Sequence, residues 1–145
     1  MNIRKGKLNF TVKLKIMLSK WFPDFFKNDD NYYVRSAVAE NPLSSINTLE
    51  VLSHDEFWEI RQSVAQNPSA YYPTLDRLSK DKDELVRLGV ARNPKTARVW
   101  EVDILVRLLK DDSKMIKDAV ILTHGERLCM NLDMDLENIV KTYYK

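Results

Sequence analysis

The sequence has little cysteine, histidine or glycine, and each shortage excludes a class of protein. Its only cysteine, Cys129, rules out an intrachain disulfide framework, and with two histidines it cannot complete a tetrahedral zinc site without carboxylates. The three glycines stand apart from one another, so the chain has no glycine-rich phosphate loop. We therefore expect a protein of a reducing, cytoplasmic setting that holds no metal or cofactor.

Long hydrophobic runs are also missing. The most apolar stretch near the start, LNFTVKLKIML at residues 8–18, is interrupted by Lys13 and Lys15 and is not followed by the small residues of a signal-peptide cleavage site. No stretch approaches the roughly 18 apolar residues of a transmembrane helix. These absences predict a soluble chain without a cleaved leader, long enough at 145 residues for one folded domain.

Positive charge is concentrated at the start of the chain. Residues 1–28 contain seven Lys or Arg and one acid, a net charge of +6, whereas the other 117 residues contain 16 basic and 20 acidic groups, a net charge of −4. This asymmetry is typical of an arm that meets an anionic partner, and equally of an arm that lies against its own acidic body.

What the sequence does contain is a repeated string. VRSAVAENP at residues 34–42 returns as IRQSVAQNP at 60–68 and as VRLGVARNP at 86–94, in steps of 26 residues. In each copy the apolar residues recur at helical spacing, and the Asn-Pro pair ends the helix because proline disfavours the helical conformation in the residue before it. A fixed period of this length predicts an α-solenoid of three to four short helical repeats.

A second short helix is expected within each repeat. It carries two leucines three residues apart on its inner side, and it is followed by an aspartate that can cap the next helix. The leucine pairs are Leu49 and Leu52, Leu75 and Leu78, and Leu105 and Leu108; the aspartates are Asp55, Asp81 and Asp111. The third repeat has four extra residues, near 98–101.

This pattern resembles the leucine-rich repeat variant family and, more loosely, HEAT repeats. The resemblance covers residues 34–94 with a specific motif and residues 95–122 loosely, and it does not include the first 30 or so residues. It implies a right-handed superhelix of stacked helical pairs, one helix of each pair being short or 3₁₀. Some members of the family carry an N-terminal iron–sulfur cluster held by cysteines. This chain has no cysteine before Cys129, so the resemblance implies no such cofactor here.

The polar residues of the repeat predict structural ladders. An arginine occupies one position per repeat, six residues after an aspartate, so we expect stacked Asp–Arg pairs that bind each unit to the next. An arginine ladder could instead bind phosphates. An asparagine before each proline is expected to satisfy free backbone groups of the neighbouring turn. The ladder residues are Arg35, Arg61 and Arg87, with Asp29, Asp55, Asp81 and Asp111, and Asn41, Asn67 and Asn93.

Partner binding is expected where the repeats differ. Trp100 and Arg98 lie in the four-residue insertion, and insertions in repeat proteins often map to loops on the binding face. Tyr71 and Tyr72 are further candidates, because tyrosine anchors protein interfaces when it reaches the surface. For aromatic residues the alternative is packing in the core.

Residues 1–33 predict a basic N-terminal helical cap or arm. The stretch alternates partly like a strand, but a strand has no pairing partner among helices, and Phe10, Leu14, Met17 and Trp21 fall at helical spacing. We expect this stripe to cap the first repeat. The alternative is a surface-seeking helix that uses basic residues such as Lys13 and Lys15 to meet an anionic membrane or nucleic acid.

Residues 116–145 predict a degenerate fourth repeat and a closing helix. Thr123-His124 stands where the other repeats have Asn-Pro, and the pattern then lapses. Degenerate end units are expected in a solenoid. Asp135 is expected to cap the closing helix, whose apolar face would consist of Leu136, Ile139 and Val140.

No catalytic arrangement is recognised in the sequence. Ser53, His54 and Asp55 adjoin, but a triad is defined by geometry, and Asp55 already belongs to the capping column. With residues 34–115 as its three central repeats, the chain is predicted to be a non-enzymatic module that binds another protein, as an adaptor, an inhibitor or an immunity-type binder. The alternative is nucleic-acid binding through residues 1–28.

Overall fold

The computed structural model describes residues 8–96 and 102–143. Within those ranges every regular element is helical, nine α-helices and two 3₁₀ helices, which confirms the all-α prediction. No described helix combines the length and the apolar character that a bilayer crossing needs. Arg98 and Trp100 lie outside the described residues, so their part in binding stays a prediction.

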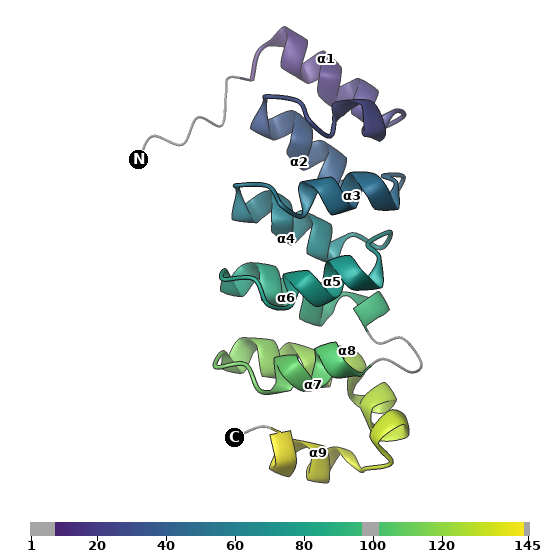
Figure 1. Cartoon of the computed structure of the whole chain (residues 1–145), viewed down its shortest axis with the longest axis vertical. Helices are drawn as coiled ribbons and strands as arrows, with labels where there is room; N and C mark the ends of the chain where they lie inside the picture. Colours follow the sequence, from purple (N-terminus) through teal and green to yellow (C-terminus); the bar gives the residue numbers. More distant parts are fainter. Residues whose placement is uncertain (1–7, 97–101, 144–145) are drawn as a thin grey trace.

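The helices form two rows along the long axis of the molecule (Figure 1). The first row consists of α1 (Phe10–Ser19), α2 (Tyr32–Glu40), α4 (Trp58–Gln66), α6 (Glu84–Arg92) and α8 (Lys114–Leu132), each in contact with the next. The second row consists of η1 (Pro23–Phe26), α3 (Ile46–Leu52), α5 (Tyr72–Leu78) and α7 (Asp103–Leu109). Each second-row helix packs on the first-row helices before and after it in the chain.

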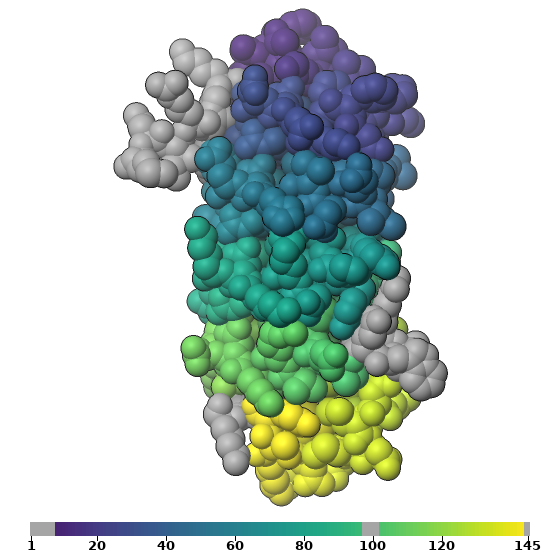
Figure 2. Space-filling view, in the orientation of Figure 1, coloured from purple at the N-terminus to yellow at the C-terminus, as the bar shows by residue number. Residues whose placement is uncertain are grey.

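The chain order of the units is also their order in space. In the space-filling view they follow one another as successive bands from the N-terminal to the C-terminal end (Figure 2). Two further elements complete the stack, η2 (Pro94–Thr96) after α6 and α9 (Leu136–Tyr143), which packs on α8.

Local sequence sets the ends of the first-row helices. Asp83 begins α6 as its N-cap, and its side chain accepts the amide of Leu85. At the other end, Asn93 leaves the helical conformation (φ −77°, ψ 120°), as the following proline requires. Asn41 and Asn67 end α2 and α4 in the same way.

The predicted leucine pairs form the core between the rows. Each of these six side chains is at most 1% exposed: Leu49, Leu52, Leu75, Leu78, Leu105 and Leu108. In the first row, α4 and α6 approach closely at Gly89, where an added Cβ would lie 3.0 Å from the Cβ of Ala65. A larger side chain at position 89 would therefore force these two helices apart.

The fourth unit differs from the others because no proline stops its first helix. α8 continues through the Thr123-His124 position to Leu132. Asp135 then accepts the amide of Asn138 at 2.8 Å at the start of α9. On α9 only Ile139 of the predicted apolar face is fully buried.

The stripe predicted to cap the first repeat faces solvent instead. α1 is a helix, but it packs on α2 through its opposite side, where Val12 and Ser19 are buried. Phe10 is 81% exposed and Trp21 75% exposed, and the other two stripe residues are exposed as well. The predicted orientation was wrong because α1 is apolar around most of its circumference, so helical spacing alone does not select the side that meets α2.

Residues 8–31 nevertheless pack as a helix pair on α2, although the sequence motif does not include them. The side-chain amide of Asn41 donates to the carbonyls of Ser19 and Lys20 at the end of α1. Lys15 donates to Asp29 at 2.6 Å, in the role that an arginine has in the later units. α1 and η1 are therefore joined to the following helices by side-chain contacts similar to those between the later helix pairs.

Candidate functional site

Three arginine–aspartate pairs connect consecutive units of the first row. In each pair Nε donates to one carboxylate oxygen at 2.7 Å, and Nη2 donates to the other at 3.0–3.2 Å. Two parallel hydrogen bonds of this kind are among the stronger side-chain interactions. The pairs are Arg35–Asp55, Arg61–Asp81 and Arg87–Asp111.

The carboxylate that pairs with each arginine is not the one expected from the sequence. The aspartate six residues earlier contributes its main-chain carbonyl, as when Arg61 Nη1 donates to the Asp55 carbonyl at 2.9 Å. The Asp55 carboxylate instead accepts from Arg35 of the preceding unit and from the amide of Phe57, the N-cap residue of α4. Each aspartate thus closes the turn before its own helix and holds the arginine of the unit before it.

Electrostatics keep two of these pairs, Arg61–Asp81 and Arg87–Asp111, ionised. The hydrogen bond with Asp81 raises the pKa of Arg61 above its ordinary value. Burial acts to raise the pKa of Asp81, but the hydrogen bonds from Arg61 and from the Asp83 amide bring it below its usual value. The pKa of Asp111 is lowered in the same way, because Arg87 and the Ser113 amide donate hydrogen bonds to its carboxylate. The guanidinium groups of the ladder are therefore engaged by carboxylates and carbonyls of the chain itself.

The asparagine column binds each unit to the one before it. The amide of Asn67 donates to the carbonyl of Ala39 at 2.7 Å and to that of Asn41 at 2.9 Å, at the end of the preceding first-row helix. In the fourth unit a histidine has this role, with His124 Nε2 3.0 Å from the carbonyl of Ala91. Burial lowers the pKa of His124, which favours the neutral imidazole as the donor.

A second ladder, which sequence reasoning missed, links the second row. Its acids recur every 26 residues, and each reaches a hydroxyl or guanidinium group of the next unit. Their step of 26 residues is the signal that could have revealed them. The contacts are Asp24 with Thr48, Glu50 with Thr74 and Arg77, and Asp76 with Arg107.

The candidate contact residues from the sequence occupy two separate regions. Lys13 and Lys15 lie on α1, and Lys15 is engaged by Asp29. Tyr71 and Tyr72 lie at the start of α5, two units further along the stack; Tyr71 is exposed, and Tyr72 packs partly buried against the core. The described candidates therefore do not form one cluster.

Ser53, His54 and Asp55 adjoin in sequence but have different partners in space. His54 Nε2 lies 3.3 Å from a carboxylate oxygen of Glu50, Ser53 donates to the Glu50 carbonyl, and Asp55 accepts from Arg35. The three side chains therefore do not form a hydrogen-bonded chain from hydroxyl to imidazole to carboxylate. In residues 8–96 and 102–143 no three His, Cys, Asp or Glu side chains are grouped to hold a metal ion.

A groove with apolar walls lies on the first row beside α6 and α8. It has a volume of about 460 Å³ and is lined by Arg92, Lys114, Met115, Asp118, Ala119, Leu122 and Thr123. Met115 and Leu122 are seven residues apart on one side of α8, and Leu122 is 88% exposed. Apolar side chains together with arginine, and charges at the rim, are typical of a protein interface, where methionine and arginine are both enriched.

Sequence reasoning did not identify Leu122, although the repeat pattern contains a signal that could have revealed it. It occupies the position that is six residues after the Val or Ile at the start of each repeat string. The three other units have Glu40, Gln66 and Arg92 at that position. An apolar residue in a column that is otherwise polar marks a surface that differs from the shared scaffold.

Comparisons with known proteins found no relative. No protein-family model matches the chain, and neither a curated protein nor a solved structure was found to be similar to it. The candidate groove therefore rests on its own geometry, and the resemblance to leucine-rich repeat variant proteins rests on the repeated motif alone.

Proposed function

We propose that this chain is a non-enzymatic α-solenoid that binds another protein in the groove beside α6 and α8. The exposure of Leu122 on the wall of this groove carries the proposal. Exposed apolar side chains next to a concavity are typical of protein interaction sites, because a partner gains free energy by covering them.

The ladders support a mechanism of rigid presentation. The Arg87–Asp111 pair links the loop before α8 to α6, and His124 links α8 to the end of α6, so both ends of the groove are held. A preorganised surface loses little conformational entropy on binding. The 26-residue step favours a right-handed solenoid that resembles leucine-rich repeat variant proteins, and nearest-neighbour contacts provide its rigidity.

Nucleic-acid binding is less well supported. The arginine ladder is engaged by carboxylates of the chain, and residues 29–145 carry a net charge of −4, which repels an extended run of phosphates.

Photo-crosslinking from the groove tests the proposal. A benzoylphenylalanine at position 122 is expected to crosslink a defined protein in host lysate, whereas the same probe at Met130, which is exposed on α8 but outside the groove, is not. With that partner purified, Leu122→Glu should weaken binding in titration calorimetry by about tenfold or more, as truncation of an interface anchor does. Met130→Glu should leave the affinity unchanged. Equal crosslinking at both positions, or an equal effect of both substitutions, would exclude the groove.

A further inference from the structure

The outer side of α1 ends the stack with an apolar surface. Its stripe of Phe10, Leu14, Met17 and Trp21 is exposed. Phe22 and Phe25 are exposed as well, and Leu18 of α1 lies beside both of them. Terminal units of stacked-repeat proteins normally present a polar outer face, because no further unit covers them. An apolar end of this kind indicates a surface that is covered by something other than the chain's own repeats.

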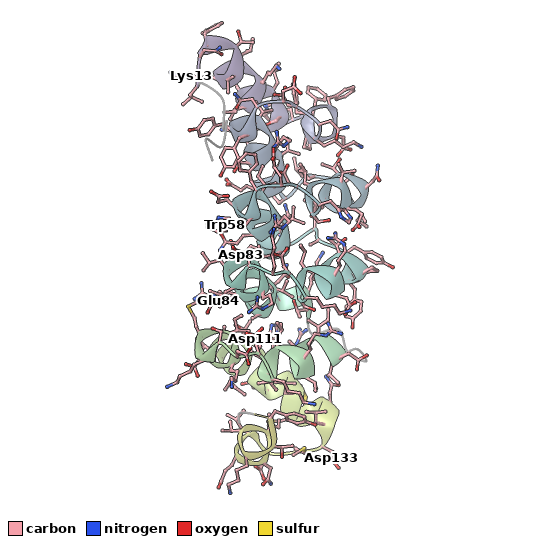
Figure 3. All side chains as sticks on the ribbon, turned by 60° about the vertical axis from the view of Figure 1, so that its left-hand side comes forward. Lys13, Trp58, Asp83, Glu84, Asp111 and Asp133 are labelled. Carbon is pink, nitrogen blue, oxygen red and sulfur yellow. The ribbon has the colours of Figure 1, made fainter. Side chains whose placement is uncertain are left out.

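Basic residues flank this stripe on one side. Lys13 and Lys20, the C-cap residue of α1, are seven residues apart, and each directly precedes a stripe residue, so both lie along the same edge of the stripe. Figure 3 labels Lys13 on α1, at the end of the stack. Among the described residues no carboxylate pairs with Lys13 or Lys20, whereas Lys15, on the packed side, is paired with Asp29.

Charge is also distributed along the long axis. Residues 8–28, which include α1 and η1, carry four lysines and one acid, a net charge of +3, whereas residues 29–145 carry −4, and α1 lies at one end of the stack (Figure 1). An anionic surface attracts the α1 end and repels the remainder, so it orients the molecule end-on. If two copies of the chain met through this end, Lys13 and Lys20 of one copy would lie near the same lysines of the other. This like-charge repulsion disfavours self-association through the α1 end.

The shape of the apolar end favours a lipid surface over a folded partner. The aromatic rings protrude: Phe10, Trp21 and Phe25 are each at least 75% exposed. Tryptophan and phenylalanine, with lysines beside them, are the side chains that interfacial helices place at the boundary between headgroups and acyl chains.

We propose that α1 docks this protein end-on to an anionic lipid membrane, with its apolar stripe at the acyl boundary and Lys13 and Lys20 on anionic headgroups. This inference goes beyond the proposed protein binding and uses a different surface. The two can therefore fail independently.

Vesicle co-sedimentation of the full chain tests the docking. The protein is expected to bind vesicles of phosphatidylcholine mixed with phosphatidylserine at least about tenfold more tightly than vesicles of phosphatidylcholine alone, and to lose this preference at high salt. Phe10→Glu/Trp21→Glu should abolish binding. Leu122 is an apolar residue of comparable exposure, but it lies in the groove rather than on α1. Leu122→Glu should therefore leave vesicle binding unchanged. Circular dichroism and urea unfolding show whether each variant keeps its fold.

The lysines provide a second, separate test. Lys13→Gln/Lys20→Gln removes two charges near the surface, each worth about fivefold in affinity, so binding to the anionic vesicles should weaken by about 25-fold. Three results would overturn the proposal. These are vesicle binding by Phe10→Glu/Trp21→Glu at the wild-type level, binding of duplex DNA without vesicle binding, and a dimer without vesicle binding that Phe10→Glu/Trp21→Glu converts to a monomer.

Discussion

Arg61 donates two hydrogen bonds to the carboxylate of Asp81, at 2.7 and 3.0 Å, and only about a tenth of each side chain is exposed. Arg61→Leu leaves the Asp81 charge partly buried without its partner, so it should lower the free energy of unfolding by about 3–5 kcal/mol, as for other broken buried pairs. Lys82→Ala, at an exposed neighbour, should change it by less than about 0.5 kcal/mol in the same urea titration. A loss below about 1 kcal/mol for Arg61→Leu would place this pair with ordinary surface pairs.

The asparagine column should make a comparable contribution. Asn67 is buried, and Asn67→Ala leaves the carbonyls of Ala39 and Asn41 without their donor, which should cost about 2 kcal/mol in urea unfolding. Asn41→Ala should cost less, because Asn41 is more exposed and water can replace its amide. Equal losses at the two positions would contradict an explanation that depends on burial.

Stability should fall in two steps as the pH is lowered. The folded-state pKa of His124 lies below its ordinary 6.5, so near that pH the unfolded chain binds more protons, and stability that is complete above pH 6.5 is lost as the pH falls towards the folded-state pKa. Asp81 and Asp111 also have lowered pKa values, so their contribution is complete above their ordinary 3.8 and is lost below it. His124→Gln keeps a donor and should remove only the first step. Urea titrations at a series of pH values measure both.

Two glycines of the first row should respond oppositely to alanine. At Gly89 an added Cβ meets the Cβ of Ala65 at 3.0 Å and the carbonyl of Gln62 at 3.3 Å, so Gly89→Ala should destabilise by about 1–3 kcal/mol. At Gly125 the nearest atom is a Leu136 methyl at 3.4 Å, an ordinary contact. Gly125→Ala should therefore stabilise by up to about 1 kcal/mol, because alanine favours a helix interior. Thermal unfolding of the two variants checks the difference in sign.

The insertion near Trp100 is expected to take part in partner binding. Trp100→Ala should weaken binding of the protein captured from position 122 by about tenfold or more, as loss of an aromatic anchor does. Lys95 is exposed and lies just before the insertion, so Lys95→Ala is the matched control in the same titration. Unchanged affinity for Trp100→Ala would leave the groove as the binding surface without the insertion.

Local features of the repeat were predictable because they depend on a few neighbouring residues. Asn93 ends α6 where the following proline disfavours a helix, and Leu75 and Leu78 are buried because spacing puts them on one side of a short helix. The partner of Arg61 was not predictable in this way. The carboxylate that Arg61 binds belongs to Asp81, 20 residues later in the chain. Only the packing of one unit on the next brings this carboxylate closer to Arg61 than that of the aspartate six residues earlier.

The sequence by itself determined that this protein is helical, where its central helices end and which leucines are buried, since short-range sterics and helical periodicity decide these properties. Only the tertiary structure decided which side of α1 meets α2, which groups the ladder residues bind and where Leu122 forms the wall of a groove. These depend on competition between surfaces far apart in the chain. α1 is apolar on more than one side, and the side that fits α2 is buried, which leaves Phe10 and Trp21 exposed.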